Sequence, residues 1–331
     1  RVLFRSDTIC EKIAQFCDVE KRAVVPMVTA PILYEIPLLL EKAKVADFLM
    51  ERLHIKQSKT PNWTGWERLV SETKREKPIV TIALVGKYVE LHDAYISVRE
   101  SLKHAALSLG VDLNLEWVHS ADLEKGRCQE VLEHADGIIV PGGFGSRGIE
   151  GKIMTAKFAR SNKVPYFGLC LGMQMMVIEF GRYILGTEDV NSSEFDRATP
   201  NPVIDLMPDQ QGITEKGGTM RLGLYPCVLQ TGTIARKAYN KKQVDERHRH
   251  RFEFNNNYRD LFTEKGMRFS GLSPDGRLVE IVEIADHPFM LGTQFHPEFL
   301  SRPTRPHPLF IAFVRAACQK AGIPFKEPPE I

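Results

Sequence analysis

The pattern of hydrophobic and polar positions changes about a quarter of the way along the chain. Residues 79–85 (IVTIALV) are a continuous apolar run with β-branched members, which is typical of a strand buried on both faces. Apolar runs then alternate with segments of helical spacing. This alternation predicts strands over 79–85, 112–118, 137–140 and 164–169, and helices over 95–109, 150–160 and 171–180. It therefore predicts an α/β fold, with a central, mostly parallel sheet flanked by helices.

After Gly186 the apolar runs become shorter and are separated by turns. We expect strands over 223–229, 249–254, 267–273, 279–284 and 289–294. A final helix over 308–321 is expected to pack back on the sheet.

The first part of the chain has a different character. Its opening (RVLFRSD) resembles the end of a buried strand, and apolar residues recur at near-helical spacing between 36 and 53, which predicts one helix. One helix and a short strand cannot enclose a core, so this part needs a further surface to pack against. Because the chain also has no initiator Met, we expect it to be the later part of a longer protein.

These patterns divide the chain into four segments. The polar stretch 56–78 ends in a charge run and Pro78, and is interpreted as a linker with one short helix; a solvated helix of the following domain is the alternative. The expected division is 1–55, linker 56–78, main domain 79–322 and tail 323–331.

Composition excludes several classes of protein. The 331 residues carry 44 basic and 42 acidic side chains, a net charge of +2, which gives no general attraction to nucleic acid or to an anionic membrane. No apolar run reaches the roughly 18 residues of a membrane-spanning helix, so none is expected, and no signal peptide is expected either. The six cysteines form no CxxC pair, so neither a zinc site nor a secreted disulfide framework is expected, and a reducing cytoplasm is favoured.

The sharpest candidate for chemistry is Gly168-Leu-Cys170-Leu-Gly172, which follows an apolar strand and begins a helix. This is the thiol form of a nucleophile elbow, in which flanking glycines permit a tight turn. The helix N-terminus favours the thiolate, which is the reactive form. A buried core cysteine is the alternative interpretation.

A nucleophilic cysteine needs a base, and His296-Pro297-Glu298 follows the strand 289–294. Glu298 could orient His296 and support its cationic form. Taken alone, a surface histidine near a proline turn would be the simpler interpretation.

The glycine-rich loop 140–148 (VPGGFGSRG) also follows a predicted strand. It lacks the GxxxxGKS/T pattern of a P-loop and fits a dinucleotide fingerprint poorly. Its backbone N–H groups could bind an oxyanion, with Gly143 and Leu171 as the donors. A simple tight turn is the alternative.

Two basic segments lie further along. In Arg247-His-Arg-His-Arg251, strand alternation places the three arginines on one face, which suits a carboxylate or phosphate ligand; a solvated strand face is the alternative. The loop 216–223 (KGGTMRLG) is interpreted as a flexible, basic lid.

Together these motifs resemble the class I glutamine amidotransferases, and within them the CTP synthase family. The resemblance extends from about residue 79 to the last helix. It rests on LVGKYVELHDAY (84–95), PGGFGSRGIEGK (141–152), GLCLGMQ (168–174), NSSEF (191–195), GGTMRLG (217–223), ERHRHRFE (246–253) and QFHPEFLSRP (294–303). It implies the flavodoxin-like amidotransferase fold.

The resemblance also implies residue roles. Cys170 would attack the glutamine side-chain amide, with His296 and Glu298 completing the triad and Gly143 and Leu171 donating to the oxyanion. The substrate L-glutamine would be held by residues that correspond to Gln174, Glu194 and Arg251. GTP activates the glutaminase in this family, and candidate contacts here are Phe144, Arg147 and Arg221.

Residues 1–55 resemble the tail of the family's P-loop-type synthetase domain, in which ammonia, ATP, magnesium and UTP give CTP. The phosphate-binding loop and the magnesium carboxylates have no counterpart in this segment, and Lys12 is the candidate nucleotide contact that remains. No cofactor and no metal are expected for the glutaminase part. The family's full-length enzyme is a cytoplasmic homotetramer.

Two other functions stay open at this point. The first is a different class I amidotransferase or a γ-glutamyl hydrolase, against which GGTMRLG and ERHRHR argue. The second is a catalytically idle binding or assembly module, which the presence of Cys170, His296 and Glu298 disfavours.

Overall fold

A computed structural model describes residues 7–27, 29–56, 59–206 and 220–327. The chain divides into two units, Arg1–Glu76 and Lys77–Ile331. The strand expected at the opening of the chain lies in 1–6, outside the described residues.

The first unit is helical where it is described. It contains α1 (Asp7–Phe16), α2 (Ile36–Lys42), α3 (Val45–Arg52) and α4 (Thr64–Thr73). The single helix expected over 36–53 is therefore wrong. Lys44 takes a left-handed conformation with φ of 54°, which breaks the continuous helical hydrogen bonding between α2 and α3.

The helix expected inside the linker exists as α4, but it packs on the first unit. Trp66 donates from its ring N–H to the carbonyl of Tyr34 at 2.6 Å, and Lys74 forms an ion pair with Glu35. The segment 56–78 thus contains the one short helix that was expected, and this helix contacts Tyr34 and Glu35 of the first unit.

The first unit buries little apolar surface by itself. Ala14 and Val70 are the buried apolar residues among its described positions, whereas the Phe16 side chain is 93% exposed. This agrees with the expectation that the segment cannot enclose a core alone.

The second unit is built on a nine-stranded sheet in its described residues, with the order β2-β1-β3-β4-β12-β11-β10-β7-β8. The bounds of these strands, in the same order, are β2 (Asp112–His119), β1 (Ile79–Gly86), β3 (Gly137–Val140), β4 (Tyr166–Leu169), β12 (Met290–Thr293), β11 (Val279–Ile284), β10 (Met267–Leu272), β7 (Arg221–Leu229) and β8 (Gln243–His250). The five strands from β2 to β12 are parallel, and those from β11 to β8 pair antiparallel. The expected α/β fold is confirmed, with a mixed sheet.

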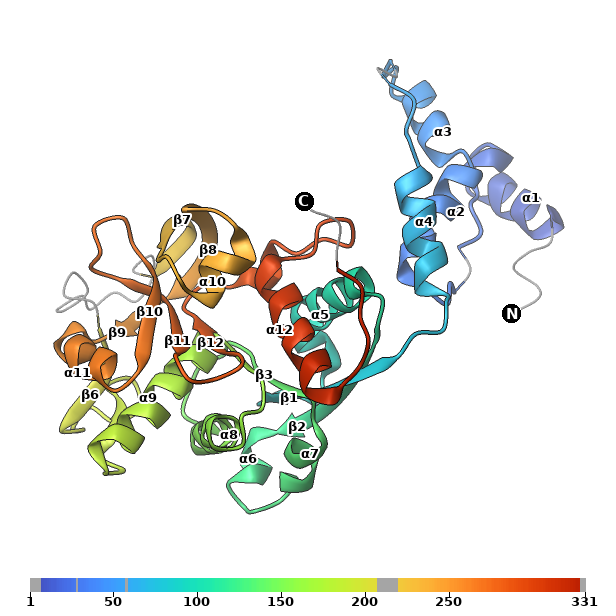
Figure 1. The fold of residues 1–331 in the computed structure, drawn as a ribbon. Coiled ribbons are helices and arrows are strands. Elements are labelled where there is room, and N and C mark those ends of the chain that lie inside the picture. Colours follow the sequence, from blue (N-terminus) through green and yellow to red (C-terminus); the bar gives the residue numbers. More distant parts are fainter. Residues whose placement is uncertain (1–6, 28, 57–58, 207–219, 328–331) are drawn as a thin grey trace. The chain divides into compact units, whose positions relative to one another are not determined.

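Helices cover both faces of this sheet. The largest are α5 (Ile96–Leu109), α8 (Ile149–Asn162), α9 (Leu171–Leu185) and α12 (Pro308–Ala321). The helices α5 and α12 cover one face, and α8 and α9 cover the other (Figure 1). In β1, Ile82 and Leu84 belong to the core on the side of α5 and α12, while Ala83 and Val85 belong to the core on the side of α8 and α9. Burial on both faces explains why the strand reads as a continuous apolar run.

Smaller elements complete the unit. The helices are α6 (Ser120–Leu123), α7 (Gln129–His134), α10 (Ile234–Tyr239) and α11 (Arg259–Glu264). A separate three-stranded sheet contains β5 (Val190–Ser192), β6 (Asn201–Leu206) and β9 (Phe252–Phe254). The strand expected over 249–254 is thus divided between two sheets, with a bend at Arg251. The helix expected over 171–180 extends to Leu185, where Gly186 ends it in a left-handed conformation.

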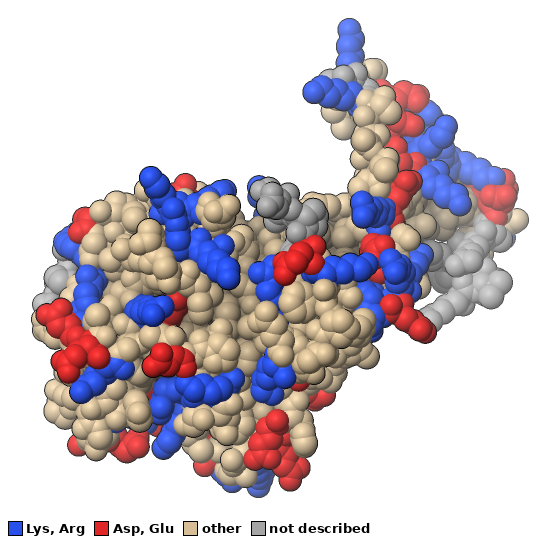
Figure 2. Space-filling view, in the orientation of Figure 1, with Lys and Arg blue, Asp and Glu red and all other residues tan. Residues whose placement is uncertain are grey.

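Charges of both signs are interspersed over the face of the molecule shown in Figure 2. No helix among the described residues has the length and apolar character needed to cross a membrane. The same residues contain no cluster of three or more potential metal ligands.

Candidate active site

Cys170 lies at the turn between β4 and α9, as the elbow motif predicts. Its backbone adopts φ of 49° and ψ of −101°, an unusual conformation for a residue with a side chain. Its N–H donates to the carbonyl of Thr293 at 2.6 Å, which fastens the turn to the end of β12. The side chain is buried.

The two flanking glycines are required by close backbone contacts. A Cβ on Gly168 would stand 2.6 Å from the backbone of Gly172, and a Cβ on Gly172 would stand 2.0 Å from the carbonyl oxygen of Val140. Both separations are far below van der Waals contact. The positive φ is at Cys170 itself, so the glycines permit packing of the turn while the cysteine carries the strain.

The sheet brings His296 to the same edge as Cys170. Strands β4 and β12 are parallel neighbours, with Leu169 paired to Thr293, so the residues after each strand emerge together. His296 Nδ1 lies 2.8 Å from Glu298 Oε1, which fixes the orientation of the imidazole ring. Nε2 has no partner of normal hydrogen-bond geometry among the described residues.

The electrostatics of His296 favour its cationic form. Burial lowers its pKa, but the nearby Cys170 and the Glu298 carboxylate raise it more, to about 10. A histidine that stays protonated beside a thiol supports a thiolate–imidazolium pair, which is the reactive state of cysteine hydrolases.

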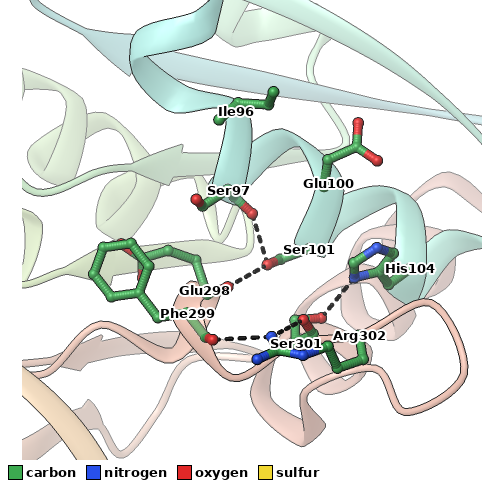
Figure 3. A pocket seen from close by; sticks show the side chains of 9 residues that line it. All are labelled: Ile96, Ser97, Glu100, Ser101, His104, Glu298, Phe299, Ser301 and Arg302. Carbon is green, nitrogen blue, oxygen red and sulfur yellow. Dashed lines mark hydrogen bonds between the residues drawn. The ribbon is translucent and has the colours of Figure 1, made fainter. Parts of the chain in front are cut away.

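The backbone of Glu298 contacts a side chain of α5. The Ser101 hydroxyl lies 3.2 Å from the backbone carbonyl of Glu298 and 2.7 Å from that of Ser97, and can donate to either. His104 Nδ1 lies 3.0 Å from the Ser301 hydroxyl in the same cavity of about 240 Å³ (Figure 3). Burial lowers the pKa of His104 to about 4, so this histidine is neutral at physiological pH.

The glycine loop borders the thiol and the imidazole. A Cβ on Gly142 would stand 2.8 Å from His296 Cε1 and 3.5 Å from Cys170 Cβ, so only glycine fits there. The next residue, Gly143, lies against Leu171, whose Cδ2 would be 3.6 Å from a Cβ at Gly143. The structure therefore places Gly143 close to the side chain of Leu171, the other residue predicted to donate to the oxyanion.

The side chain of Gln174 is buried and bonded to other protein groups. Its Nε2 donates to the Phe252 carbonyl at 3.1 Å and to Gln294 Oε1 at 3.2 Å. Gln294 in turn points its Nε2 toward Cys170 Sγ at 3.6 Å. Gln174 is thus connected to the cysteine by a chain of hydrogen bonds through Gln294.

Glu194 and Arg251 come together although 57 residues separate them in the chain. Glu194 follows β5, and Arg251 stands between β8 and β9. Burial raises the pKa of Glu194, and the charge of Arg251 partly offsets this, which places the guanidinium within electrostatic range of the carboxylate. A carboxylate beside a guanidinium suits a zwitterionic ligand.

Two of the three candidate GTP contacts lie on the surface. Phe144 is half-exposed, and the Arg249 guanidinium stands 5.5 Å from the centre of its ring. Arg147 is exposed, and its guanidinium stands 5.7 Å from the ring of Tyr88.

Arg221, the third candidate GTP contact, is buried. It is 8% exposed and pairs with Glu280 at 2.6 Å, beneath the sheet surface. The reason is alternation along β7, which turns this side chain inward toward buried carboxylates. Half of the predicted lid, 216–219, lies outside the described residues.

Lys12 is exposed on α1 in the first unit. No metal site is assigned to any predicted residue.

Sequence reasoning missed three residues of this site: Gln294, Arg249 and Lys152. Gln294 stands two positions before His296 and is fully buried, which is unusual for a glutamine. Arg249 was recognised as basic but was not linked to Phe144. Lys152 is a buried lysine of α8, and no pattern in the sequence distinguishes it from exposed lysines.

Comparison with known proteins agrees with this geometry. Residues 90–316 match the family model described as glutamine amidotransferase class-I, and residues 4–55 match the one described as CTP synthase N-terminus.

Curated relatives named CTP synthase are similar over nearly the whole chain. The protein of Dehalococcoides mccartyi strain BAV1 is 59% identical over 312 residues, covering 94% of this chain and 57% of the relative. That of Roseiflexus sp. strain RS-1 is 58% identical, covering 95% of this chain and 56% of the relative. The chain thus spans somewhat more than half the length of the curated relatives it matches.

Among solved structures, the glutaminase domain of Trypanosoma brucei CTPS with bound acivicin is similar. It is 38% identical with a TM-score of 0.68, and the match covers 72% of this chain and 94% of that one. The fold, the two family models and these relatives agree, and the chain belongs to the CTP synthase family, with a class-I glutamine amidotransferase domain in its second unit.

Proposed function

We propose that the second unit hydrolyses L-glutamine to glutamate and ammonia. The observation that carries this proposal is the arrangement of Cys170 at the strained β4–α9 turn, beside an imidazole that Glu298 orients at 2.8 Å. A buried structural cysteine would need neither the strained backbone nor an oriented, cationic histidine.

The chemistry follows from these groups. The Cys170 thiol gives its proton to His296, and the thiolate adds to the side-chain carbonyl carbon of glutamine. The carbonyl electron pair moves to oxygen, where the N–H groups of Gly143 and Leu171 stabilise the negative charge. Collapse expels ammonia with the proton from His296 and leaves a γ-glutamyl thioester. Water, deprotonated by His296, attacks the thioester and releases glutamate and the thiol.

Recognition of the substrate is assigned to the opposite charges of Glu194 and Arg251. Glu194 binds the α-ammonium group and Arg251 the α-carboxylate, while Gln174 and Gln294 hold the thiol in place. A γ-glutamyl hydrolase acting on long polyglutamyl chains would compete with this proposal if such substrates were turned over.

The test of the proposal is glutamate release by the purified chain. Cys170→Ala is expected to abolish both release and covalent labelling by a glutamine-like electrophile, while Cys128→Ala, at an exposed cysteine, keeps both. Unchanged hydrolysis by Cys170→Ala would refute the mechanism. Binding of glutamine without any turnover by the parent chain would favour the idle module.

For the whole protein we propose the reaction named for the relatives, ATP-dependent amination of UTP to CTP. Ammonia from the glutaminase would meet UTP and ATP, with magnesium, in a cytoplasmic homotetramer. Support comes from the match of residues 4–55 to the CTP synthase N-terminus. The exposed Phe144, with Arg249 stacked on it, suits a purine ring, and Arg147 suits its phosphates, which supports activation by GTP.

CTP formation tests this second part. Residues 1–78 contain no glycine-rich loop with a lysine at a helix start, so this chain with ATP, UTP, magnesium and free ammonia is expected to make no CTP. Because free ammonia bypasses the glutaminase, the test isolates the synthetase. Joining the chain to the preceding segment of a relative should restore synthesis from ammonia and from glutamine. CTP made by this chain alone would contradict the prediction that the chain lacks the synthetase site.

A further inference from the structure

Lys152 is a buried cation that the mechanism above does not use. It lies in the first turn of α8, directly after the glycine loop, and only 1% of its surface is exposed. Lysine is almost never buried to this extent unless it is paired. A lysine retained in such a position needs an explanation in either packing or charge.

The end of the Lys152 side chain lies beneath the glycine loop. Its Nζ is 3.6 Å from the position that a Cβ on Gly143 would take, and Leu171 Cδ2 is at the same distance from that position. Gly143 and Leu171 are the two residues whose N–H groups are assigned to the oxyanion. The ammonium therefore lies beside the point at which negative charge would develop.

No carboxylate neutralises this ammonium in the part of the chain that the structure describes. Lys152 has neither an ion pair nor a hydrogen bond there. Glu150, on the same helix, and Glu124, directly after α6, are engaged with other groups. Glu150 pairs with Arg182 at 2.6 Å, and Glu124 accepts a hydrogen bond from the N–H of Gly151 at 3.2 Å.

Two other titratable groups act on Lys152. Burial lowers its pKa to about 8, the charge of Lys87 lowers it as well, and Cys170 raises it. Lys87 follows β1 and donates from Nζ to the Phe144 carbonyl at 3.3 Å, so it also contacts the glycine loop. Lys152 is thus mostly protonated at neutral pH and becomes neutral in mildly alkaline solution.

We propose that Lys152 is a positioning residue of the glutaminase, whose buried ammonium supports the loop at Gly143 and favours negative charge at Cys170 and at the substrate oxyanion. A single charge acts strongly here because Lys152 is buried, so little solvent screening intervenes. This inference rests on the proposed glutamine hydrolysis.

Three variants separate charge from packing. Lys152→Met keeps the length and apolar stem of the side chain but removes the charge. Lys152→Arg keeps a charge that does not titrate below about pH 12. Lys157→Met, at an exposed lysine on the same helix, is the matched control.

The first measurement is glutamine hydrolysis as a function of pH. We expect Lys152→Met to lower kcat by roughly 10- to 100-fold with little change in KM, because loss of oxyanion stabilisation affects the transition state more than the bound substrate. The parent kcat should fall as pH rises through about 8. This decline should be absent in Lys152→Met and displaced to higher pH in Lys152→Arg, while Lys157→Met behaves as the parent.

The second measurement does not need turnover. Alkylation of Cys170 by iodoacetamide at pH 7 should be several-fold slower in Lys152→Met than in the parent or in Lys157→Met. If the parent releases no glutamate, the proposed function fails, yet this labelling still tests Lys152. A folded Lys152→Met with the parent's labelling rate and pH profile would overturn the inference. Equal losses in Lys152→Met and Lys152→Arg, with no change in pH profile, would also overturn it and assign the lysine to packing.

Discussion

The backbone N–H of His296 donates a hydrogen bond to the carbonyl of Arg247, at 2.8 Å. This bond ties the segment that carries the proposed base to β8, the last strand of the antiparallel half of the sheet. Since Cys170 is tied to Thr293 at the end of β12, nucleophile and base are fixed by main-chain bonds to different strands. The sheet therefore fixes the positions of the two backbones that carry the proposed nucleophile and base.

The elbow should not tolerate a methyl group at Gly172. Gly172→Ala places a Cβ 2.0 Å from the Val140 carbonyl oxygen, so β3 or α9 must move. We expect destabilisation of about 3 kcal/mol or more, at or above the usual range for overpacked cores, measured by urea unfolding. Gly65→Ala in α4, where a Cβ meets nothing within 4 Å, is the control and should be neutral or slightly stabilising. Equal stability of Gly172→Ala and the parent would show that the turn is looser than described.

If Glu298 orients His296, substitution of either residue should lower the rate of glutamate release. His296→Ala is expected to slow glutamate release by about 10²- to 10⁴-fold, and Glu298→Gln by less, since the amide can still accept a hydrogen bond from Nδ1–H. Calorimetric binding of glutamine to the Cys170→Ala background should survive both changes. Loss of binding together with loss of fold would instead indicate a structural histidine.

Stability in acid should depend on His104. The folded protein holds this histidine neutral with a pKa of about 4, against an ordinary value of 6.5, so the unfolded chain binds its proton first as pH falls. The free energy of unfolding should therefore decrease between about pH 6.5 and pH 4, by about 1–3 kcal/mol from this group. His104→Gln should remove that part of the slope in denaturant titrations across this range. A slope identical to that of the parent would mean that His104 is solvated in solution.

The buried pair of Arg221 and Glu280 should contribute to the stability of the fold and not to the binding of GTP. Arg221→Met removes the arginine partner of the fully buried Glu280 and leaves it only its contact with His248 Nε2 at 2.6 Å, so it should destabilise the protein by about 3–5 kcal/mol. Arg249→Met, at an exposed arginine, should leave the melting temperature unchanged. If Arg221→Met melts with the parent but loses a response to GTP, the original expectation of a phosphate contact would be restored.

Periodicity and local motifs determined a large part of this fold. The strand over 137–140, the strand over 279–284 and the helix over 308–321 were predicted with the bounds that the structure has, because each is a short apolar run or a clear helical stripe between turn residues. The Gly168–Gly172 elbow was equally readable, since its geometry depends on residues that are adjacent in the chain.

What depended on tertiary contacts could not be predicted. Lys44 divides the helix expected over 36–53, although nothing in its own propensity requires this. Arg221 and Lys152 look in sequence like other surface cations, and their burial follows from strand alternation against Glu280 and from the loop above α8. The sequence by itself thus determined the strands, the turn and the identity of the candidate triad. The tertiary structure decided which charges are buried, because the environment of a charge depends on side chains that are distant in the chain.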